Sequence, residues 1–307
     1  MPCKYCLTKP VIQLTNSQIK LCRNCFIKYF EKKALKTIKT YNLIEKNDKI
    51  AVAVSGGKDS LTVLNLINLI RNKFRNIELE AVLIDEGIKN YRDKTILDAK
   101  KFCKANKIKL NIFSYKKEFG YTLDEMIKKF NLKPCTVCGV LRRYLLNKYA
   151  RNLGFNKLAT GHNLDDEVQS ILMNQFKDNI EVSARLGPLT GIKKDKNFIP
   201  RIKPLYLLTE KETAVYAYLK GFTSSFAECP NSSESYRGYV RDMINDFEAK
   251  SPGTKHGIIH SFLKILPLLK EHYKNISSEI KLCSECGEPC TADICQACKL
   301  IDKIKKS

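Results

Sequence analysis

The stretch Asp48-Lys-Ile-Ala-Val-Ala-Val54, followed directly by Ser55-Gly-Gly-Lys-Asp-Ser60, decides the fold. Residues 48–54 form a short segment rich in β-branched side chains, which is typical of a buried parallel strand. Leu61–Ile70 then carries apolar residues at helical spacing. A glycine turn between a strand and a helix directs backbone N–H groups and the positive end of the helix dipole at one point, where an anion can bind. The sequence therefore predicts a phosphate-binding loop at residues 55–60.

The side chains of this loop suit a polyphosphate. Gly56 and Gly57 let the backbone approach closely, Lys58 adds a positive charge, and the serines at both ends add hydroxyl groups. Asp59 can cap the helix or help to hold a metal ion such as Mg2+. The segment is not a Walker loop, because that pattern requires four residues between its first glycine and Gly-Lys-Ser/Thr.

The middle of the chain alternates between strand and helix patterns. Strands are predicted at Glu78–Ile84, Lys109–Phe113 and Lys157–Thr160. Helices are predicted at Arg92–Asn106, Thr122–Phe130, Thr136–Asn152, Thr209–Lys220, Arg237–Phe247 and His256–Lys281. A further helix is predicted to follow Gly161–Asp166 and to run to about Phe176. Repeated β-α units indicate a parallel sheet with helices on both faces and ligands at the carboxyl ends of the strands. The loop at 55–60, Asp85 and Gly161–Asp166 all follow such strand ends.

Eight of the 13 cysteines form two pairs of C-x2-C units, one at each end of the chain. They are Cys3, Cys6, Cys22 and Cys25, and Cys283, Cys286, Cys295 and Cys298. In a reducing compartment such cysteines favour metal binding over disulfides. Two C-x2-C turns complete a tetrahedral thiolate shell that leaves no open position for chemistry. We therefore predict two structural Zn2+ sites, called here the N-terminal and C-terminal knuckles.

Three further cysteines form a less decisive pattern. Cys135 and Cys138 make a third C-x2-C unit without a second pair nearby, and Cys229 stands far along the chain. Three thiolates suit a [4Fe-4S] cluster, which would leave one iron free for a non-protein ligand. A redox pair beside an unrelated thiol is the alternative, and the pattern by itself leaves both open.

The charge of the chain indicates a polyanionic partner. There are 54 Lys and Arg against 32 Asp and Glu, a net charge of +22, and each phosphate neutralised by such a surface releases counterions. A lysine-rich proteome is the alternative explanation. The longest apolar stretches, such as Ile50–Val54 and Leu61–Ile70, are too short or too interrupted to span a bilayer. The first residues also lack the apolar run of a secretory signal, so we expect a cytoplasmic protein without membrane association.

Residues 55–60 match the SGGxDS motif and so resemble the PP-loop of the ATP pyrophosphatase superfamily. Over nearly its whole length, the chain resembles the TtuA-like tRNA 2-thiouridine synthetases. Besides the loop and the knuckles, this resemblance rests on Asp85-Glu-Gly-Ile88, Cys135-x-x-Cys138-Gly with Arg142-Arg143, Gly161-His-Asn-Leu-Asp-Asp166 and Glu228-Cys-Pro230. A related group that thiolates a tRNA cytidine shares the PP-loop and the cysteine trio but lacks both knuckles.

The resemblance implies an α/β fold: a Rossmann-type, parallel-sheet PP-loop domain (adenine nucleotide alpha-hydrolase-like) flanked by the two four-cysteine zinc knuckles. The N-terminal knuckle is expected in residues 1–30, the ATP pyrophosphatase catalytic domain in 31–250, and a C-terminal helix and knuckle in 251–307. A homodimer is also expected.

The resemblance also assigns site residues. Those that would contact ATP are Val54, Ser55, Gly56, Gly57, Lys58, Asp59, Ser60, Ile84, Arg142 and Gly161. The family's three cluster cysteines map onto Cys135, Cys138 and Cys229, and Asp166 matches its catalytic acidic residue. Arg142 stands where the family places a basic residue facing the ATP phosphates. An arginine there would clamp phosphate but would be a poor proton donor.

The implied reaction replaces the C2 oxygen of a tRNA uridine by sulfur. With the pyrophosphate of ATP on the loop, together with Mg2+, the uridine oxygen attacks the α-phosphate, and Lys58 and Arg142 stabilise the developing charge. A hydrosulfide on the open iron of a [4Fe-4S] cluster then displaces AMP. The sulfur donor is either free sulfide or a ubiquitin-like thiocarboxylate protein.

Several alternatives stay open at this point. The chain is rich in Asn and Lys without a thermophile bias, which favours the wobble uridine, position 34, over the T-loop uridine, position 54. The same chemistry at an anticodon-loop cytidine, position 32, or on a small amide is a second enzyme reading. A non-catalytic, zinc-containing tRNA-binding protein is the remaining alternative, although the intact Lys58 and Asp59 argue against a phosphate loop that has lost its function.

Overall fold

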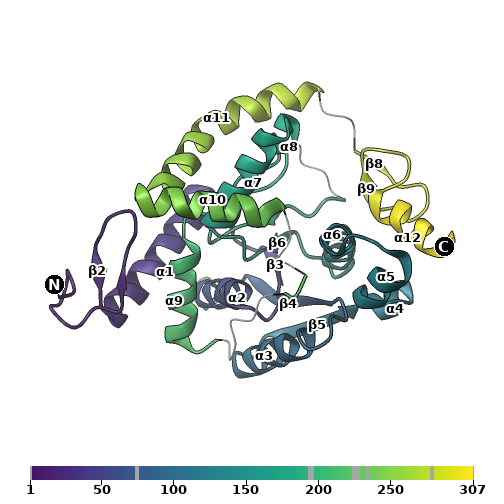
Figure 1. Ribbon diagram of the computed structural model, residues 1–307. Helices are drawn as coiled ribbons and strands as arrows, with labels where there is room; N and C mark the ends of the chain where they lie inside the picture. Colours follow the sequence, from purple (N-terminus) through teal and green to yellow (C-terminus); the bar gives the residue numbers. More distant parts are fainter. Residues whose placement is uncertain are drawn as a thin grey trace.

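A parallel five-stranded sheet lies at the centre of the computed structural model (Figure 1), which describes residues 2–72, 76–192, 197–222, 229–231, 236–276 and 280–306. Its strands are β3 (Lys49–Ala53), β4 (Glu78–Asp85), β5 (Lys109–Ser114), β6 (Lys157–Ala159) and β7 (Arg201–Ile202). They lie in the order β5-β4-β3-β6-β7, and every neighbouring pair is parallel. The predicted parallel α/β sheet is therefore confirmed.

Helices cover both faces of this sheet because successive strand residues point to opposite sides. Ile50 and Val52 of β3 belong to one core, whereas Ala51 belongs to the other. The first core includes α1 (Arg23–Thr40), α2 (Lys58–Arg71), α3 (Arg92–Ala105) and α9 (Glu210–Lys220). The second includes α5 (Leu123–Phe130), α6 (Pro134–Asn152) and α12 (Gln296–Lys306). This two-sided burial explains the almost continuous apolar strands.

A third, smaller core joins three helices beyond the β6–β7 side of the sheet: α7 (Leu164–Phe176), α10 (Tyr236–Lys250) and α11 (Thr254–Ile276). Two short helices, α4 (Tyr115–Phe119) and α8 (Ile180–Ala184), complete the helices of the described residues. Within the described ranges, no helix combines the length and the apolar character that a membrane crossing requires.

Each knuckle contains a small hairpin and packs on the central domain. The hairpins are β1 (Ile12–Gln13) with β2 (Lys20–Leu21), and β8 (Lys281–Leu282) with β9 (Pro289–Cys290). Cys3 and Cys22 belong to the core of α1 and α2, and Cys283, Cys295 and Cys298 belong to the core of α6. Figure 1 shows the two knuckles at opposite ends of the molecule. Helix α1 continues across residue 30, the predicted end of the first domain.

Two expectations about the helices meet different outcomes. Thr209 caps α9 as predicted: its hydroxyl accepts from the Glu212 N–H while the Glu212 carboxylate accepts from the Thr209 N–H. The predicted helix over His256–Lys281 is wrong at its end, because α11 is assigned only to Ile276 and Lys281 already belongs to the C-terminal hairpin. Lys281 pairs with Cys290 in the hairpin, and this pairing overrides the helical periodicity of the sequence around Lys281. A local sequence pattern does not reveal such a partner.

The strand order creates a switch point between β3 and β6. The chain runs outward from β3 to β4 and β5, then returns to place β6 on the other side of β3. Ligands of open α/β sheets bind at such a point. The loop after β6 approaches the phosphate loop so closely that a Cβ on Gly161 would lie 2.9 Å from the Ser60 nitrogen. Only glycine allows this contact, which unites two of the predicted motifs.

Candidate functional site

The phosphate loop is shaped by hydrogen bonds among its own residues. The Ser55 N–H donates to Ser60 Oγ (3.0 Å), and the Gly57 N–H donates to Ser55 Oγ (3.3 Å). Gly56 has φ +83°, and a Cβ there would lie 1.9 Å from the Thr95 carbonyl oxygen. Helix α2 begins at Lys58, so its free N–H groups and dipole face the loop. The backbone is therefore ready to bind an anion.

The other predicted nucleotide contacts surround this loop. Val54 is buried at the end of β3, where its N–H donates to the Val82 carbonyl at 2.8 Å. Ile84 is buried near the end of β4. These two residues lie on the β4 side of the loop, whereas Gly161 lies on its β6 side. The assigned nucleotide contacts thus converge on one edge of the sheet, although their roles stay predictions.

A polar network connects the phosphate loop with the loop after β6. Lys58 Nζ contacts Asp59 Oδ2 (2.9 Å) and Glu210 Oε1 (3.1 Å). The other oxygen of Asp59 accepts from the Asn163 side chain (3.2 Å). Although burial lowers the pKa of Lys58, the two carboxylates raise it above its usual range. Lys58 is therefore a permanent cation beside the expected position of the phosphates.

Asp166 lies at the start of α7, one step further along this network. Its Oδ2 accepts from the Asn163 N–H (3.1 Å), and Asn163 Oδ1 accepts from the Asp166 N–H, which forms a capping box. Burial, with help from the charges of Asp59 and Glu167, raises the pKa of Asp166 to about 7. A carboxyl group with this pKa can exchange a proton near neutrality, which suits a general acid or base.

His162, next to Asp166 in the motif, has a different character. Its Nδ1 lies 2.9 Å from the Thr160 hydroxyl. Desolvation at this edge of the sheet, together with the cations Lys203 and Arg201, lowers its pKa below the usual value. His162 therefore stays neutral at physiological pH, and the helix cap beside it is Asn163.

The three cysteines predicted to hold a cluster, Cys135, Cys138 and Cys229, come together at the N-terminus of α6. Cys138 and Cys229 are both half-buried and pack on the same core. Cys135 Sγ donates to the carbonyl of Asn231 (3.3 Å), two residues beyond Cys229. Glu228 of the predicted motif lies outside the described residues. The segment around Cys229 therefore returns to the C-x2-C unit despite the long stretch of sequence between them.

These three thiols form a different arrangement from the knuckles. In the described part of the chain, the groups whose ligand atoms all lie within 4.8 Å of one another are the two knuckles, and the trio is not among them. A cubane cluster spaces its ligands more widely than a single ion does, and three thiolates are its ordinary donors. The chemistry of the donor set thus fits a cluster better than a further zinc ion.

A chain of ion pairs links Cys138 with the phosphate loop. Arg142 donates to Cys138 Sγ (2.9 Å) and to Glu86 Oε1 (2.7 Å). The second oxygen of Glu86 pairs with Arg92 Nε at 2.7 Å. Arg92 in turn donates to the Ser55 carbonyl oxygen (2.7 Å) and to that of Ile84. We call Arg142, Glu86 and Arg92 the ionic bridge.

Two of the three side chains in the ionic bridge are buried. The side chains of Glu86 and Arg92 are only 1% and 5% exposed, whereas that of Arg142 is 45% exposed. Arg142 was expected to face the ATP phosphates. Here it lies between Cys138 and Glu86, from where one guanidinium can contact both parts of the site. Neither Glu86 nor Arg92 had a predicted role; the place of Glu86 in the Asp85-Glu-Gly-Ile88 motif at a strand end was the available signal.

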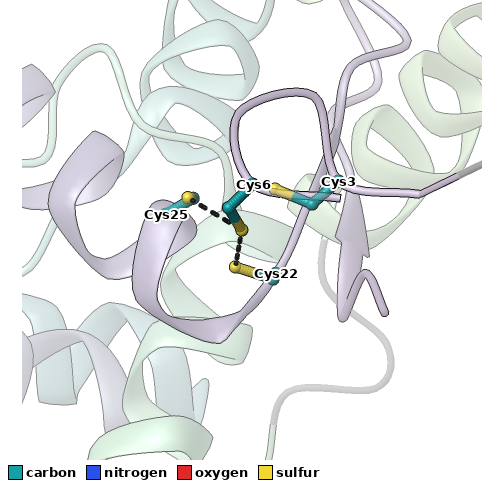
Figure 2. A group of neighbouring side chains, drawn as sticks. All are labelled: Cys3, Cys6, Cys22 and Cys25. Carbon is teal, nitrogen blue, oxygen red and sulfur yellow. Dashed lines mark hydrogen bonds between the residues drawn. The ribbon is translucent and has the colours of Figure 1, made fainter. Parts of the chain in front are cut away.

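The four N-terminal cysteines converge as the spacing predicts. Figure 2 shows Cys6 between Cys22 and Cys25, with sulfur separations of 3.3 Å and 3.7 Å. Hydrogen bonds, above all from Thr8, lower the pKa of Cys22 to about 6 and favour its metal-binding thiolate form. The C-terminal group is equally tight, with Cys286 and Cys295 sulfurs 3.8 Å apart. Both all-sulfur groups fit tetrahedral zinc.

We expect the purified chain to contain two zinc ions, and a Cys22→Ser or Cys295→Ser variant to contain one, because three thiolates bind zinc far more weakly than four. Elemental analysis after gel filtration measures this. Cys290→Ser is the matched control, because the predicted C-terminal zinc shell does not use its thiol. Full zinc content in Cys22→Ser would contradict the assignment of the N-terminal knuckle.

Comparison with known proteins places this geometry in a family. The family model described as a PP-loop domain matches residues 27–247. A probable sulfurtransferase of Methanocaldococcus jannaschii is 39% identical over 93% of this chain and 83% of its own length. The tRNA 2-thiolation protein NcsA of Haloferax volcanii is 34% identical over 99% of both chains. The chain belongs to the PP-loop family of tRNA 2-thiolation sulfurtransferases.

Two further members of this family bear on the reaction. The tRNA-5-methyluridine(54) 2-sulfurtransferase of Pyrococcus horikoshii is 36% identical over 97% of this chain and 93% of its own length. The solved U34-tRNA thiolase NcsA of Methanococcus maripaludis, described with its [4Fe-4S] cluster, superposes with a TM-score of 0.82 at 32% identity, covering 98% of this chain and 95% of that one. The family resemblance inferred from the sequence is thus confirmed.

Proposed function

We propose that this protein is an ATP-dependent tRNA uridine 2-sulfurtransferase that forms 2-thiouridine at the wobble position, 34. The observation that carries the proposal is the ionic bridge, because it joins the Cys138 sulfur and the Ser55 end of the phosphate loop in one continuous network. A thiolase needs its nucleotide and its sulfur chemistry within reach of the same uridine.

Activation of the uridine is the first step. The phosphate loop binds the β- and γ-phosphates of ATP, and Mg2+ bound with them would take a ligand from Asp59. The uridine C2 oxygen attacks the α-phosphate, pyrophosphate leaves, and Asp166 accepts the proton from N3. Lys58 stabilises the negative charge on the phosphates, while Arg142 can turn its exposed side toward them.

Replacement of the oxygen is the second step, in which sulfide adds at C2 and AMP leaves. Cys135, Cys138 and Cys229 would hold the iron–sulfur cluster. When bound, a cluster held by three cysteines supplies an iron with an open position for sulfide, fixing the sulfide and lowering its proton affinity. Burial raises the pKa of Cys138, and the Arg142 guanidinium bonded to its Sγ opposes this shift.

The wobble position is favoured by the superposition on a U34-tRNA thiolase over nearly the whole of both chains. The relative that carries position 54 in its name is more similar in sequence, at 36% identity against 32% for the U34-tRNA thiolase, so the T-loop uridine is the competing candidate. The chain composition, rich in Asn and Lys without a thermophile bias, adds support for position 34.

The test is a thiolation assay with protein purified without oxygen and loaded with iron and sulfide. Transcripts of one tRNA that keep uridine only at position 34, or only at position 54, are incubated with ATP and sulfide and digested for mass spectrometry of nucleosides. We expect 2-thiouridine only in the first transcript and only with ATP. Product only in the second would overturn the wobble assignment, and product in neither would overturn the function.

The raised pKa of Asp166 predicts a pH dependence. If its ionised form accepts the N3 proton, the thiolation rate should rise as pH increases through about 7, where Asp166 loses its own proton. Asp166→Asn should lower the rate by about 10²-fold and remove this rise. Single-turnover rates on both sides of pH 7 measure it, with exposed Asp242→Asn as the control. A variant that keeps the rise would exclude Asp166 as the base.

A further inference from the structure

Two arginines near the cysteine trio stand without a counter-charge. No carboxylate partner is found within the described ranges for Arg143 of α6 or for Arg201 of β7. Other cations around them are paired: Lys203 with buried Glu167 (2.7 Å), and Arg237 with Asp166 (4.0 Å). Arg143 is exposed and Arg201 half-buried. Solvent can therefore reach this pair from outside.

A side-chain contact made by α6 places the two arginines near each other. The side chain of Asn147 accepts from the Ile199 N–H at 3.1 Å, which fixes α6 against the segment leading into β7. Arg143 stands four residues before Asn147 on the same helix face, about 6 Å along its axis. Arg201, the first residue of β7, stands two residues after Ile199, about 6.6 Å along an extended chain, and Pro200 between them already accepts from the Leu158 N–H of β6 (3.0 Å). Since a helix that precedes a parallel strand runs antiparallel to it, the two displacements have the same direction.

The side chain of Arg143 confirms this direction. It folds back over Gly139, so that a Cβ on Gly139 would lie 3.3 Å from Arg143 Nη1. Gly139 follows Cys138 directly, and the guanidinium therefore lies within one helical turn of the sulfur site. Burial, together with the nearby charge of Arg143, lowers the pKa of Arg201 to about 10.

Two adjacent guanidinium groups without a carboxylate suit a phosphate, whose oxygens accept bidentate hydrogen bonds. The phosphate could belong to ATP or to RNA. The predicted nucleoside contacts Val54 and Ile84 lie at β3 and β4, whereas Arg201 lies on the edge strand β7, about 10 Å to the other side of β3. This position, away from those contacts, therefore favours a phosphate of the RNA.

We propose that Arg143 and Arg201 together bind one backbone phosphate of the RNA substrate, next to the nucleotide that enters the site. The inference rests on the proposed function. It adds a fixed contact that would hold an unstacked uridine at a set distance from Cys138, without reading its sequence.

The test compares Arg143→Gln and Arg201→Gln in the metal-loaded full chain. Fluorescence anisotropy of labelled tRNA over a range of salt concentrations gives the affinity and its salt slope, and a separate titration gives ATP affinity. Each variant should bind tRNA about tenfold more weakly, with a log–log salt slope smaller by about 1. ATP affinity should not change. Arg→Lys at either position should restore the slope but only part of the affinity.

Arg71→Gln is the matched control, because Arg71 is the last residue of α2 and lies at the end of that helix opposite the phosphate loop. Weaker ATP binding with unchanged tRNA binding would assign the pair to the nucleotide and overturn the proposal, as would unchanged binding of both. A wild-type chain that binds tRNA with this salt dependence but forms no 2-thiouridine would overturn only the proposed function. A wild-type chain that does not bind tRNA would overturn both.

Discussion

A Cys138→Ala variant is expected to lose all measurable tRNA thiolation while keeping both zinc ions and its ATP affinity. Cys138 combines two roles in the structure: it is one of three thiols at the start of α6, and it accepts a hydrogen bond from Arg142. Without it, two cysteines remain to hold a cluster, and the sulfide is no longer positioned. The measurements are product formation by mass spectrometry, iron content and visible absorbance after anoxic purification.

Cys103→Ala is the matched control for this loss. Cys103 is buried on α3, away from the trio, and its removal should affect activity little. Cys229→Ala should reproduce the Cys138→Ala result, because both thiols pack on the same core. If either variant of the trio kept normal activity after strictly anoxic purification, the cluster role of these cysteines would be wrong.

The second large effect is expected at Glu86. Glu86→Ala should lower the free energy of unfolding by about 3 kcal/mol or more, because it leaves the buried guanidinium of Arg92 without its counter-charge. The loss should appear as a fall of several degrees in Tm. Activity should fall as well in the fraction that stays folded, since Arg142 and Arg92 lose their common partner.

Glu78→Ala is the control on the same strand, because Glu78 forms an exposed ion pair with Lys49 and should change the stability by less than about 1 kcal/mol. Thermal unfolding with the zinc content held constant separates the two variants. Equal Tm values for Glu86→Ala and Glu78→Ala would contradict the importance of the ionic bridge.

Local patterns in the sequence predicted the parts of this fold that depend on local chemistry. The phosphate loop follows from Gly56 and from the strand and helix around it, and the cap of α9 follows from Thr209 and Glu212. The knuckles follow from cysteine spacing. In each of these cases, the residues that interact lie close in sequence or repeat a known ligand pattern.

The remaining parts depend on residues that meet only after folding. Arg92 reaches the phosphate loop and Glu86 at once, and no spacing rule pairs an acidic residue at a strand end with arginines of two different helices. Arg201 lies in a two-residue strand that has no alternation to detect. The meeting of Cys229 with Cys138 came from family resemblance, because a single distant thiol carries no geometric signal.

The attachment of the C-terminal knuckle to α6 has a practical consequence. Glu288, inside that knuckle, pairs with Arg151 and accepts from Asn147, so the C-terminal half of α6 is held by the segment in which we predict a zinc site. A preparation exposed to strong chelators would therefore contain molecules in which α6 has lost its contacts with the C-terminal knuckle. Specific activities from different laboratories would then be comparable only after normalisation to bound zinc as well as to iron.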